Sequence, residues 1–361
     1  MSKKTNAINF LVLTSMVAVV MGCGREATNV SVVQNEQPAS VNEAKASPEY
    51  SLYAPTIQLN AQRAAIEEIC RWADTNDTSV GCAVIVDETG NVIAIADCGG
   101  TNDEPRPFAV HRKIEPGHLL SPFTAAVAIN SRAIRSIESE FTSDRAESAF
   151  SEYRLPWDGS DEISVLSVSN ALVRSSNTVM SKIGLLCGRH ELYDGFSRLG
   201  LVSSVKVPNR WSMQERARIP IGQGIRMNAL DLARAYAILA NSGCSTNGEQ
   251  VISAETAASI LSALEGVVQS GTGCNAAVYH VRIAGKTSTS VRMSKNGCYE
   301  SGKYISAFAS IFPAEKPKYA MVVWFETARN EKEPRLHFGG GRAALASRAI
   351  IKRIISLYGD E

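Results

Sequence analysis

The sequence predicts an α+β fold in which strands near both ends of the chain form one antiparallel sheet, covered by helices, beside an all-helical lobe. Two β-rich runs lie within residues 80–97, and strand-like segments return only after residue 277. Between them, residues 121–264 have a mainly helical pattern. A two-stranded hairpin is only marginally stable alone, so the early and late strands are expected to join. A cleft between the sheet edge and the lobe is then the natural place for a ligand.

The composition bounds the class of protein. The chain has 361 residues, 45% of them hydrophobic and 20% charged, which is typical of a globular protein with a substantial core. The net charge is +1 and no long basic run is present, which excludes the electrostatic pattern of a nucleic-acid-binding protein. The cysteine and histidine spacings fit no zinc pattern, so we expect neither a metal nor an organic cofactor.

The first 22 residues are predicted to be a lipoprotein signal peptide. Lys3 and Lys4 precede a short apolar run over residues 8–20, and small Gly22 stands directly before Cys23. This order resembles a bacterial lipobox, in which Cys23 is lipidated and becomes the mature N-terminus. The alternative is an ordinary signal peptide with an incidental cysteine. Gly24, rather than aspartate, follows the cysteine, so the usual inner-membrane retention signal is missing. We expect an exported protein on the periplasmic side of a membrane; the outer membrane is a plausible address, and the sequence leaves inner versus outer membrane open.

Residues 23–55 are predicted to be a flexible tether, because their polar composition cannot bury enough surface to fold. Residues 56–361 then form the globular domain. Beyond Cys23 seven cysteines remain, and this odd number leaves at least one free thiol or an intermolecular bridge. The sequence leaves the disulfide connectivity open.

The individual elements follow from periodicity and turn residues. Apolar residues at helical spacing predict a helix over 60–74, and two β-rich runs around the turn at 88–91 predict a hairpin. Gly243 is a typical helix stop. The predicted elements in chain order are helix 60–74, strands 80–87 and 92–97, helices 122–130, 164–176, 178–187 and 229–243, strands 278–290, 304–313 and 318–327, and helix 343–358.

Six segments carry a family pattern. They are "EPGHLLSPFTAAVAI" from Glu115, "NALVRSSNTVMSKIG", "IPIGQGIRMNALDLARAYAILANSG", "GTG" at 271–273, "IAGKTSTS" and "HFGGGRAALA". In this order they resemble the transpeptidase domain of penicillin-binding proteins, the serine acyl-transferases that cross-link peptidoglycan. The resemblance extends from about residue 80 to the C-terminus.

The resemblance implies a known chemistry. In that family a serine attacks a peptidyl-D-alanine carbonyl, and a lysine three positions later on the same helix face takes its proton. A Ser-x-Asn loop relays protons and holds the substrate backbone, while a Lys-Thr-Gly strand forms the other wall. Backbone N–H groups of the nucleophile and of the residue after Lys-Thr-Gly form an oxyanion hole.

Carried over residue by residue, the pattern is incomplete. The nucleophile position is His118 and the general-base position is Ser121. The Ser-x-Asn positions are intact as Ser175 and Asn177. Lys286 and Thr287 keep the Lys-Thr pair of the Lys-Thr-Gly motif. Ser288 stands in place of the glycine, where its side chain is expected to narrow the substrate groove. The resemblance implies that Thr289 supplies the second oxyanion N–H.

These departures predict a domain that has lost its reaction. An acyl-imidazole on His118 hydrolyses readily, and Ser121 has only His118 or Lys286 to activate it. We expect His118 and Ser121 to be a polar pair left after the motif was lost. The other Ser-x-x-Lys of the mature chain, Ser203 to Lys206, lies in a strand-like stretch where the two side chains share no helix face.

The surviving residues also have purely structural interpretations. Lys286 fits a solvated lysine at a strand end, and Ser175 and Asn177 fit helix-capping roles. The GQG at 222–224 is most simply a backbone-turn requirement. Since the family pattern is retained at these positions, we expect the cleft to persist.

Three functions follow as hypotheses. The first is a lipid-anchored, catalytically inactive homologue that binds peptidoglycan, its stem peptide or cell-wall synthesis proteins. The second is an active D,D-transpeptidase or carboxypeptidase that uses Ser121 or His118 with Lys286. The third is a β-lactam or muropeptide sensor related to the β-lactamase superfamily.

Overall fold

The computed structural model describes residues 56–73, 78–100, 105–143, 163–202, 211–294, 296–329, 332–333 and 335–358. The predicted signal peptide, Cys23 and the tether lie outside the described residues, and so does the Ser203 to Lys206 segment. None of the described helices is long and apolar enough to cross a membrane.

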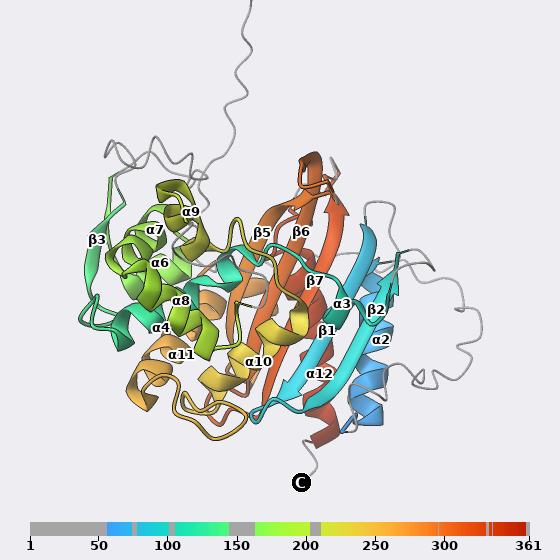
Figure 1. Cartoon of the computed structure of the whole chain (residues 1–361). Helices are drawn as coiled ribbons and strands as arrows, with labels where there is room; N and C mark the ends of the chain where they lie inside the picture. The colour runs from blue at the N-terminus through green and yellow to red at the C-terminus, as the bar shows by residue number, and fades with distance from the viewer. Residues whose placement is uncertain are drawn as a thin grey trace, which may run out of the picture.

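Strands from both ends of the chain form one five-stranded antiparallel sheet, as the sequence predicts (Figure 1). The N-terminal strand β1 pairs with β7 near the C-terminus, with Val84 opposite Val322. The sheet order is β2-β1-β7-β6-β5, so β2 and β5 are its edges. The strands are β1 (Thr78–Asp87), β2 (Val92–Gly99), β5 (Ala284–Met293), β6 (Tyr299–Phe312) and β7 (Tyr319–Ala328).

The starts of two strands differ clearly from the prediction: β6 begins at Tyr299 rather than at residue 304, and β5 begins later than expected. The strand-like segment at 278–290 is expected to be extended throughout, but Val278 and Val281 form only an isolated bridge, and β5 begins at Ala284. The reason is local, because His280 between them has a left-handed backbone with φ of 65°, which makes a tight turn.

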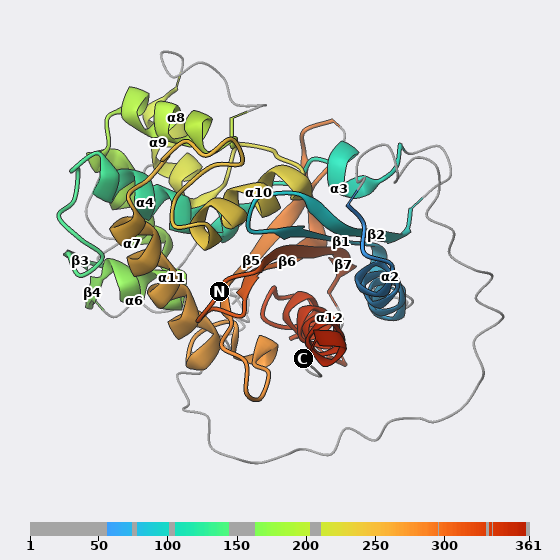
Figure 2. The same ribbon diagram turned by 90° about the horizontal axis from the view of Figure 1, so that it is seen from below.

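Helices cover both faces of the sheet (Figure 2). On one face lie α2 (Leu59–Ala73) and α12 (Arg342–Tyr358), close to their predicted ranges, and their apolar sides share a core with Phe308 and Phe325. On the other face lies α10 (Ala229–Ala240), whose end is closed by Gly243 with φ of 86°. This three-layer packing buries both faces of the central strands.

The β2 edge is covered by the segment that leads into α2. The Thr56 hydroxyl donates to the Val92 carbonyl, and the amide of Gln62 bonds both the N–H and the C=O of Ile95 at 2.8 and 2.5 Å. The Gln62 side chain thus forms the two backbone hydrogen bonds that a neighbouring strand would form with Ile95, and this part of the β2 edge is covered against pairing with another strand.

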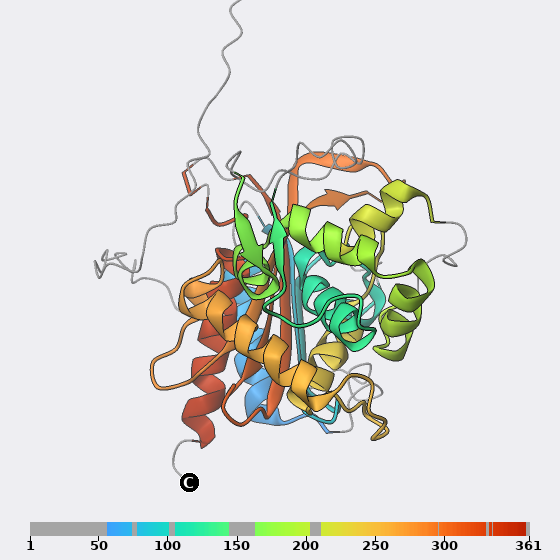
Figure 3. The same cartoon turned by 90° about the vertical axis from the view of Figure 1, so that its left-hand side faces the viewer.

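The lobe lies beside the β5 edge, and Figure 3 shows it next to the sheet with α12 on the opposite side. Its described residues are mainly helical and include a two-stranded ribbon of β3 (Glu140–Thr142) and β4 (Val165–Ser167), so the helix predicted over 164–176 begins only at residue 168. The lobe helices are α4 (Ser121–Asn130), α6 (Val168–Arg174), α7 (Asn177–Leu186), α8 (Arg189–Arg198), α9 (Met213–Arg218) and α11 (Ala254–Gln269).

Candidate active site

Two glycines set the backbone on which His118 stands. His118 lies in a short 3₁₀ turn, Gly117–Leu119, that runs into α4. The Gly117 N–H donates to the Gly222 carbonyl at 3.1 Å, and a Cβ on Gly222 would stand 2.1 Å from the Gly117 oxygen. Both glycines have positive φ, 52° and 72°. The EPG and GQG segments are therefore locked backbone to backbone, which confirms a structural need for the GQG turn.

The predicted contact between His118 and Ser121 is present. His118 Nδ1 lies 2.8 Å from Ser121 Oγ, and Nε2 lies 3.0 Å from Asn177 Oδ1. Burial and the nearby charge of Lys286 lower the pKa of His118 to about 3, so its imidazole is neutral at neutral pH. Since the Asn177 carbonyl oxygen only accepts, Nε2 carries the proton and Nδ1 accepts the Ser121 hydroxyl. Both ring nitrogens are engaged.

Ser121 is enclosed. Its exposed fraction is 0%, whereas His118 is partly exposed. The hydroxyl at the general-base position therefore lies behind the imidazole and has no open path to a carbonyl in the cleft. This geometry argues against Ser121 as a nucleophile.

Lys286 is buried, not solvated. It stands inside β5 with an exposed fraction of 0%, which rules out a strand-end lysine in water. Its Nζ donates to the Ser175 hydroxyl and, at 3.3 Å, to the Thr287 carbonyl. Burial lowers the pKa of Lys286 to about 7, so near neutral pH about half of the amines are uncharged and able to accept a proton.

The Ser-x-Asn side chains do not cap helices. Ser175 ends α6 in a left-handed conformation with φ of 58°, an unusual state for a residue other than glycine. The N-cap bond of α7 comes instead from Ser176, whose hydroxyl accepts from the Val179 N–H. Ser175 is the C-cap residue of α6, but it caps through its backbone N–H, which donates to the Ala171 and Leu172 carbonyls. The Ser175 and Asn177 side chains contact Lys286 and His118 instead, so neither side chain has the N-cap role.

The rest of the Lys-Thr segment is packed from both sides. Thr287 Oγ1 lies 2.6 Å from Thr272 Oγ1 of the GTG segment, and Thr289 Oγ1 accepts from the Gly339 N–H. Ser288 is 4% exposed, and its Oγ lies 2.2 Å from where a Cβ on Gly117 would stand. The extra hydroxymethyl at position 288 therefore fills the gap between β5 and the His118 turn.

The structure brings six predicted site residues together from three distant segments. They are joined in two short chains, Ser121–His118–Asn177 and Ser175–Lys286–Thr287, which meet at the start of α7. The described residues contain no cluster of three or more histidine, cysteine or acidic side chains fit to hold a metal. The site can therefore move protons between side chains of this chain, with Lys286 as its titrating group.

Sequence reasoning assigned no role to Glu115. Burial raises the pKa of its carboxyl, which accepts hydrogen bonds from the Gly224 N–H and the Tyr299 hydroxyl. The carboxylate thereby ties the GQG turn to the start of β6. The position of Glu115 at the start of the EPG segment was the sequence feature from which a role for it could have been inferred.

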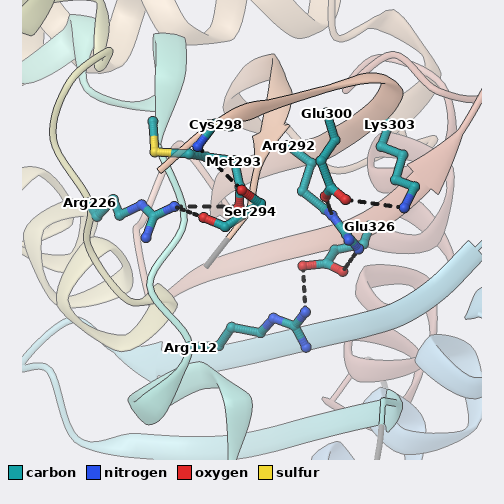
Figure 4. A network of polar contacts seen from close by, with 9 residues as sticks. All are labelled: Arg112, Arg226, Arg292, Met293, Ser294, Cys298, Glu300, Lys303 and Glu326. Atoms are coloured by element: carbon teal, nitrogen blue, oxygen red, sulfur yellow. Dashed lines mark hydrogen bonds and ion pairs between the residues drawn. The ribbon is translucent and has the colours of Figure 1, made fainter. Parts of the chain in front are cut away.

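A second polar network lies farther along β5 (Figure 4). Buried Glu326 accepts from Arg112 at 2.7 Å and from Arg292 at 2.8 Å, and Arg292 also pairs with Glu300. This network borders a cavity of about 610 Å³, which is lined by Arg112, Arg226 and Arg292 rather than by His118 or Lys286. The cavity also reaches the family segments, because Glu115 and Arg226 are among its lining residues. The network itself links β5, β6 and β7 through Arg292, Glu300 and Glu326.

Comparison with known proteins gives the following matches. Residues 81–352 match the family model described as the penicillin binding protein transpeptidase domain. The chain is 26% identical over 339 residues to the peptidoglycan D,D-transpeptidase FtsI of Escherichia coli, covering 84% of this chain and 55% of that protein. It is 25% identical over 345 residues to the probable peptidoglycan D,D-transpeptidase PenA of Neisseria flavescens, covering 84% and 82%.

Solved structures share the fold. The transpeptidase domain of Burkholderia pseudomallei penicillin-binding protein 3 superposes with a TM-score of 0.70 at 23% identity, covering 84% of this chain and 96% of that one. Mycobacterium tuberculosis penicillin-binding protein 3 complexed with aztreonam gives a TM-score of 0.69 at 21% identity, covering 84% and 78%.

Proposed function

Because the chain belongs to the penicillin-binding protein transpeptidase family, we propose that it is a lipid-anchored cell-envelope protein that binds peptidoglycan stem peptides without acylation. The chain spans 55% of the length of the Escherichia coli relative, so the activity of that whole protein is not transferred to it. In this proposal the ligand is still a peptidoglycan stem peptide, as in the family, but the protein does not form a covalent acyl bond with it.

The observation that carries this proposal is the state of His118. A neutral imidazole with both nitrogens hydrogen-bonded stands at the nucleophile position, and the hydroxyl behind it is fully enclosed. Attack by an imidazole nitrogen gives an acyl-imidazole, which water cleaves readily, and no lasting ester can form there. Position 118 thus lacks a group that stores the acyl intermediate.

Binding is supported by the opposite wall. Ser175, Lys286 and Thr287 keep their mutual contacts, and β5 lies at the edge of the sheet beside the lobe. Residues 284–288 of β5 are buried, whereas Thr289 and Val291 farther along the strand are exposed. An exposed stretch of edge strand offers backbone donors and acceptors to an extended peptide, which is the β-augmentation mode of recognition. A short peptide ending in D-alanyl-D-alanine fits this mode.

The membrane anchor is proposed from the sequence alone. The basic start, the short apolar run and the Gly22–Cys23 pair support cleavage before Cys23 and lipidation of its thiol. Radiolabelled palmitate incorporated into the wild-type chain, and absent from Cys23→Ala, is the expected result. Equal labelling of both chains contradicts the anchor.

The test of the main proposal is acylation by a β-lactam. The full-length chain, incubated with a fluorescent penicillin, should show no covalent adduct by intact-mass analysis. In parallel, a D-alanyl-D-alanine stem peptide should bind reversibly in calorimetry without being hydrolysed. A stoichiometric adduct overturns the proposal.

A matched variant tests the site itself. His118→Ser with Ser121→Lys restores the Ser-x-x-Lys pair on the same backbone, and we expect it to gain penicillin labelling. The single variant His118→Ser is the control, because it has the hydroxyl but lacks the lysine three residues later. A folded but unlabelled double variant contradicts the view that damage is confined to this motif.

One contact favours a second candidate, a slow D,D-peptidase with a non-standard nucleophile. The partly exposed Ser175 hydroxyl touches Lys286, whose pKa of about 7 suits proton transfer. This candidate predicts D-alanine release that is lost in Ser175→Ala and in Lys286→Ala. Release that survives both changes, or no release at all, rejects it.

A further inference from the structure

The seven described cysteines are all thiols, and one pair of them is in contact. Cys70 on α2 and Cys98 on β2 are within side-chain hydrogen-bonding range of each other. Two of the other thiols have different partners: Cys244 Sγ donates to the Gln250 side-chain oxygen, and Cys187 is within hydrogen-bonding range of Ser131. If Cys70 and Cys98 are paired, the other five of the seven described cysteines remain thiols, which accounts for the odd number.

The surrounding fold holds this pair in register. Gln62, two turns earlier on α2, fixes the helix to Ile95 of β2 through both amide atoms. Cys98 lies three residues beyond Ile95 and packs with the α2 and α12 core. Helix α2 therefore follows β2 along its length, and the two sulfurs meet near the far end of both elements without a loop between them.

We propose that Cys70 and Cys98 form a structural disulfide in the exported protein. Its place outside the cytoplasm rests on the proposed function, since disulfides persist in oxidising compartments. The oxidant is a disulfide-bearing molecule such as oxidised glutathione or the disulfide form of a thiol–disulfide oxidoreductase.

The disulfide forms by two successive thiol–disulfide exchanges. One protein thiolate attacks a sulfur of the oxidant, which breaks the oxidant S–S bond, forms a mixed disulfide and releases the first thiol. The second protein thiolate attacks the mixed disulfide, forms the Cys70–Cys98 bond and releases the second thiol. The protein is oxidised by two electrons, and its two thiol protons end on the two released thiols.

The charges around the pair set how fast this occurs. The Cys98 thiol, burial and the Asp97 carboxylate raise the pKa of Cys70, and the Arg106 guanidinium opposes them. Arg106 itself pairs with Asp97 at 2.5 Å. Because the attacking species is the thiolate, oxidation should quicken as pH rises from 7 to 9.

Cys82 is the sequence neighbour that a mapping experiment must exclude. It lies on β1 in the core of the lobe-facing side of the sheet, whereas Cys98 packs on the side of α2 and α12. The sheet therefore separates Cys82 from this pair.

The experiment maps the bond in the purified full-length chain. After equilibration with oxidised glutathione, free thiols are alkylated under denaturing conditions and the chain is digested with trypsin. Peptide 64–71 contains Cys70, and peptide 72–112 contains both Cys82 and Cys98. We expect these peptides to be cross-linked in the wild type and in Cys82→Ala, and not in Cys70→Ser or Cys98→Ser.

Thermal unfolding gives an independent measurement. Dithiothreitol should lower the Tm of the oxidised wild type by roughly 5–10 °C, and leave that of Cys70→Ser unchanged. Complete alkylation of both peptides in the wild type, or a cross-link that disappears in Cys82→Ala, overturns the proposal. Neither outcome depends on penicillin labelling, so the proposed function and this disulfide can fail separately.

Discussion

Replacing Lys286 by methionine tests whether the amine of the site is uncharged. The side chain is fully buried, and burial lowers its pKa from 10.5 to about 7. Methionine keeps a similar length and has no charge. Any stability that depends on the ionisation of Lys286 therefore disappears in Lys286→Met.

The magnitude follows from proton linkage. Between pH 7 and pH 10.5 the unfolded chain holds a proton on Lys286 that the folded chain has released, so the free energy of unfolding rises with pH. A shift of this size corresponds to roughly 5 kcal/mol between the two limits. Between pH 7 and pH 9 the wild type should gain about 2 kcal/mol relative to Lys286→Met, and below pH 7 the difference should be nearly constant.

The assay is urea unfolding of both chains at pH 6, 7, 8 and 9, with the difference in free energy plotted against pH. The control is Lys316→Met, because Lys316 is exposed and its charge stays in water in both states. A difference for Lys286→Met that is flat from pH 7 to pH 9 refutes the argument that the folded amine is neutral, and with it the view of Lys286 as the titrating group.

Three further predictions follow from the same geometry. Gly117→Ala should lower the free energy of unfolding by about 2 kcal/mol, because Gly117 has a positive φ and an added Cβ would meet the Ser288 hydroxyl. In a double-mutant cycle, Ser288→Gly should recover only the part of this loss that comes from the steric contact. A fully additive cycle contradicts the contact. Gln62→Leu should lower the free energy of unfolding by about 2–4 kcal/mol, because the N–H and C=O of Ile95 in β2 lose their hydrogen bonds to the Gln62 side chain. Arg63→Leu, at an exposed position of the same helix, should have little effect in the same urea-unfolding measurement. The imidazole of His118 should stay neutral in ¹⁵N NMR spectra down to pH 5, and protonation near pH 6.5 refutes the burial argument.

The sheet was predictable because its signals are local. Alternating β-branched residues bounded by turn residues mark β1 and β2, and the marginal stability of an isolated hairpin requires a partner such as β7. The ribbon of β3 and β4 was not predictable, since three-residue strands carry no usable period. The left-handed backbone at His280 likewise leaves no signal in a segment that otherwise has strand character.

The site was predictable only through the family resemblance. His118, Asn177 and Lys286 are far apart in the chain, and no periodicity relates them. The resemblance gave their positions but not their environment. A lysine is normally exposed, so the complete burial of Lys286 had to be read from the structure, and so did the capping role of Ser176.

The glycine pair beneath His118 separates architecture from chemistry. The turn at 117–119 is shaped by main-chain contact with Gly222, in which the imidazole takes no part. The backbone conformation of residues 117–119 therefore does not depend on the side chain at position 118. A change of that side chain during evolution leaves the domain folded, and other nucleophilic residues can be introduced there by design.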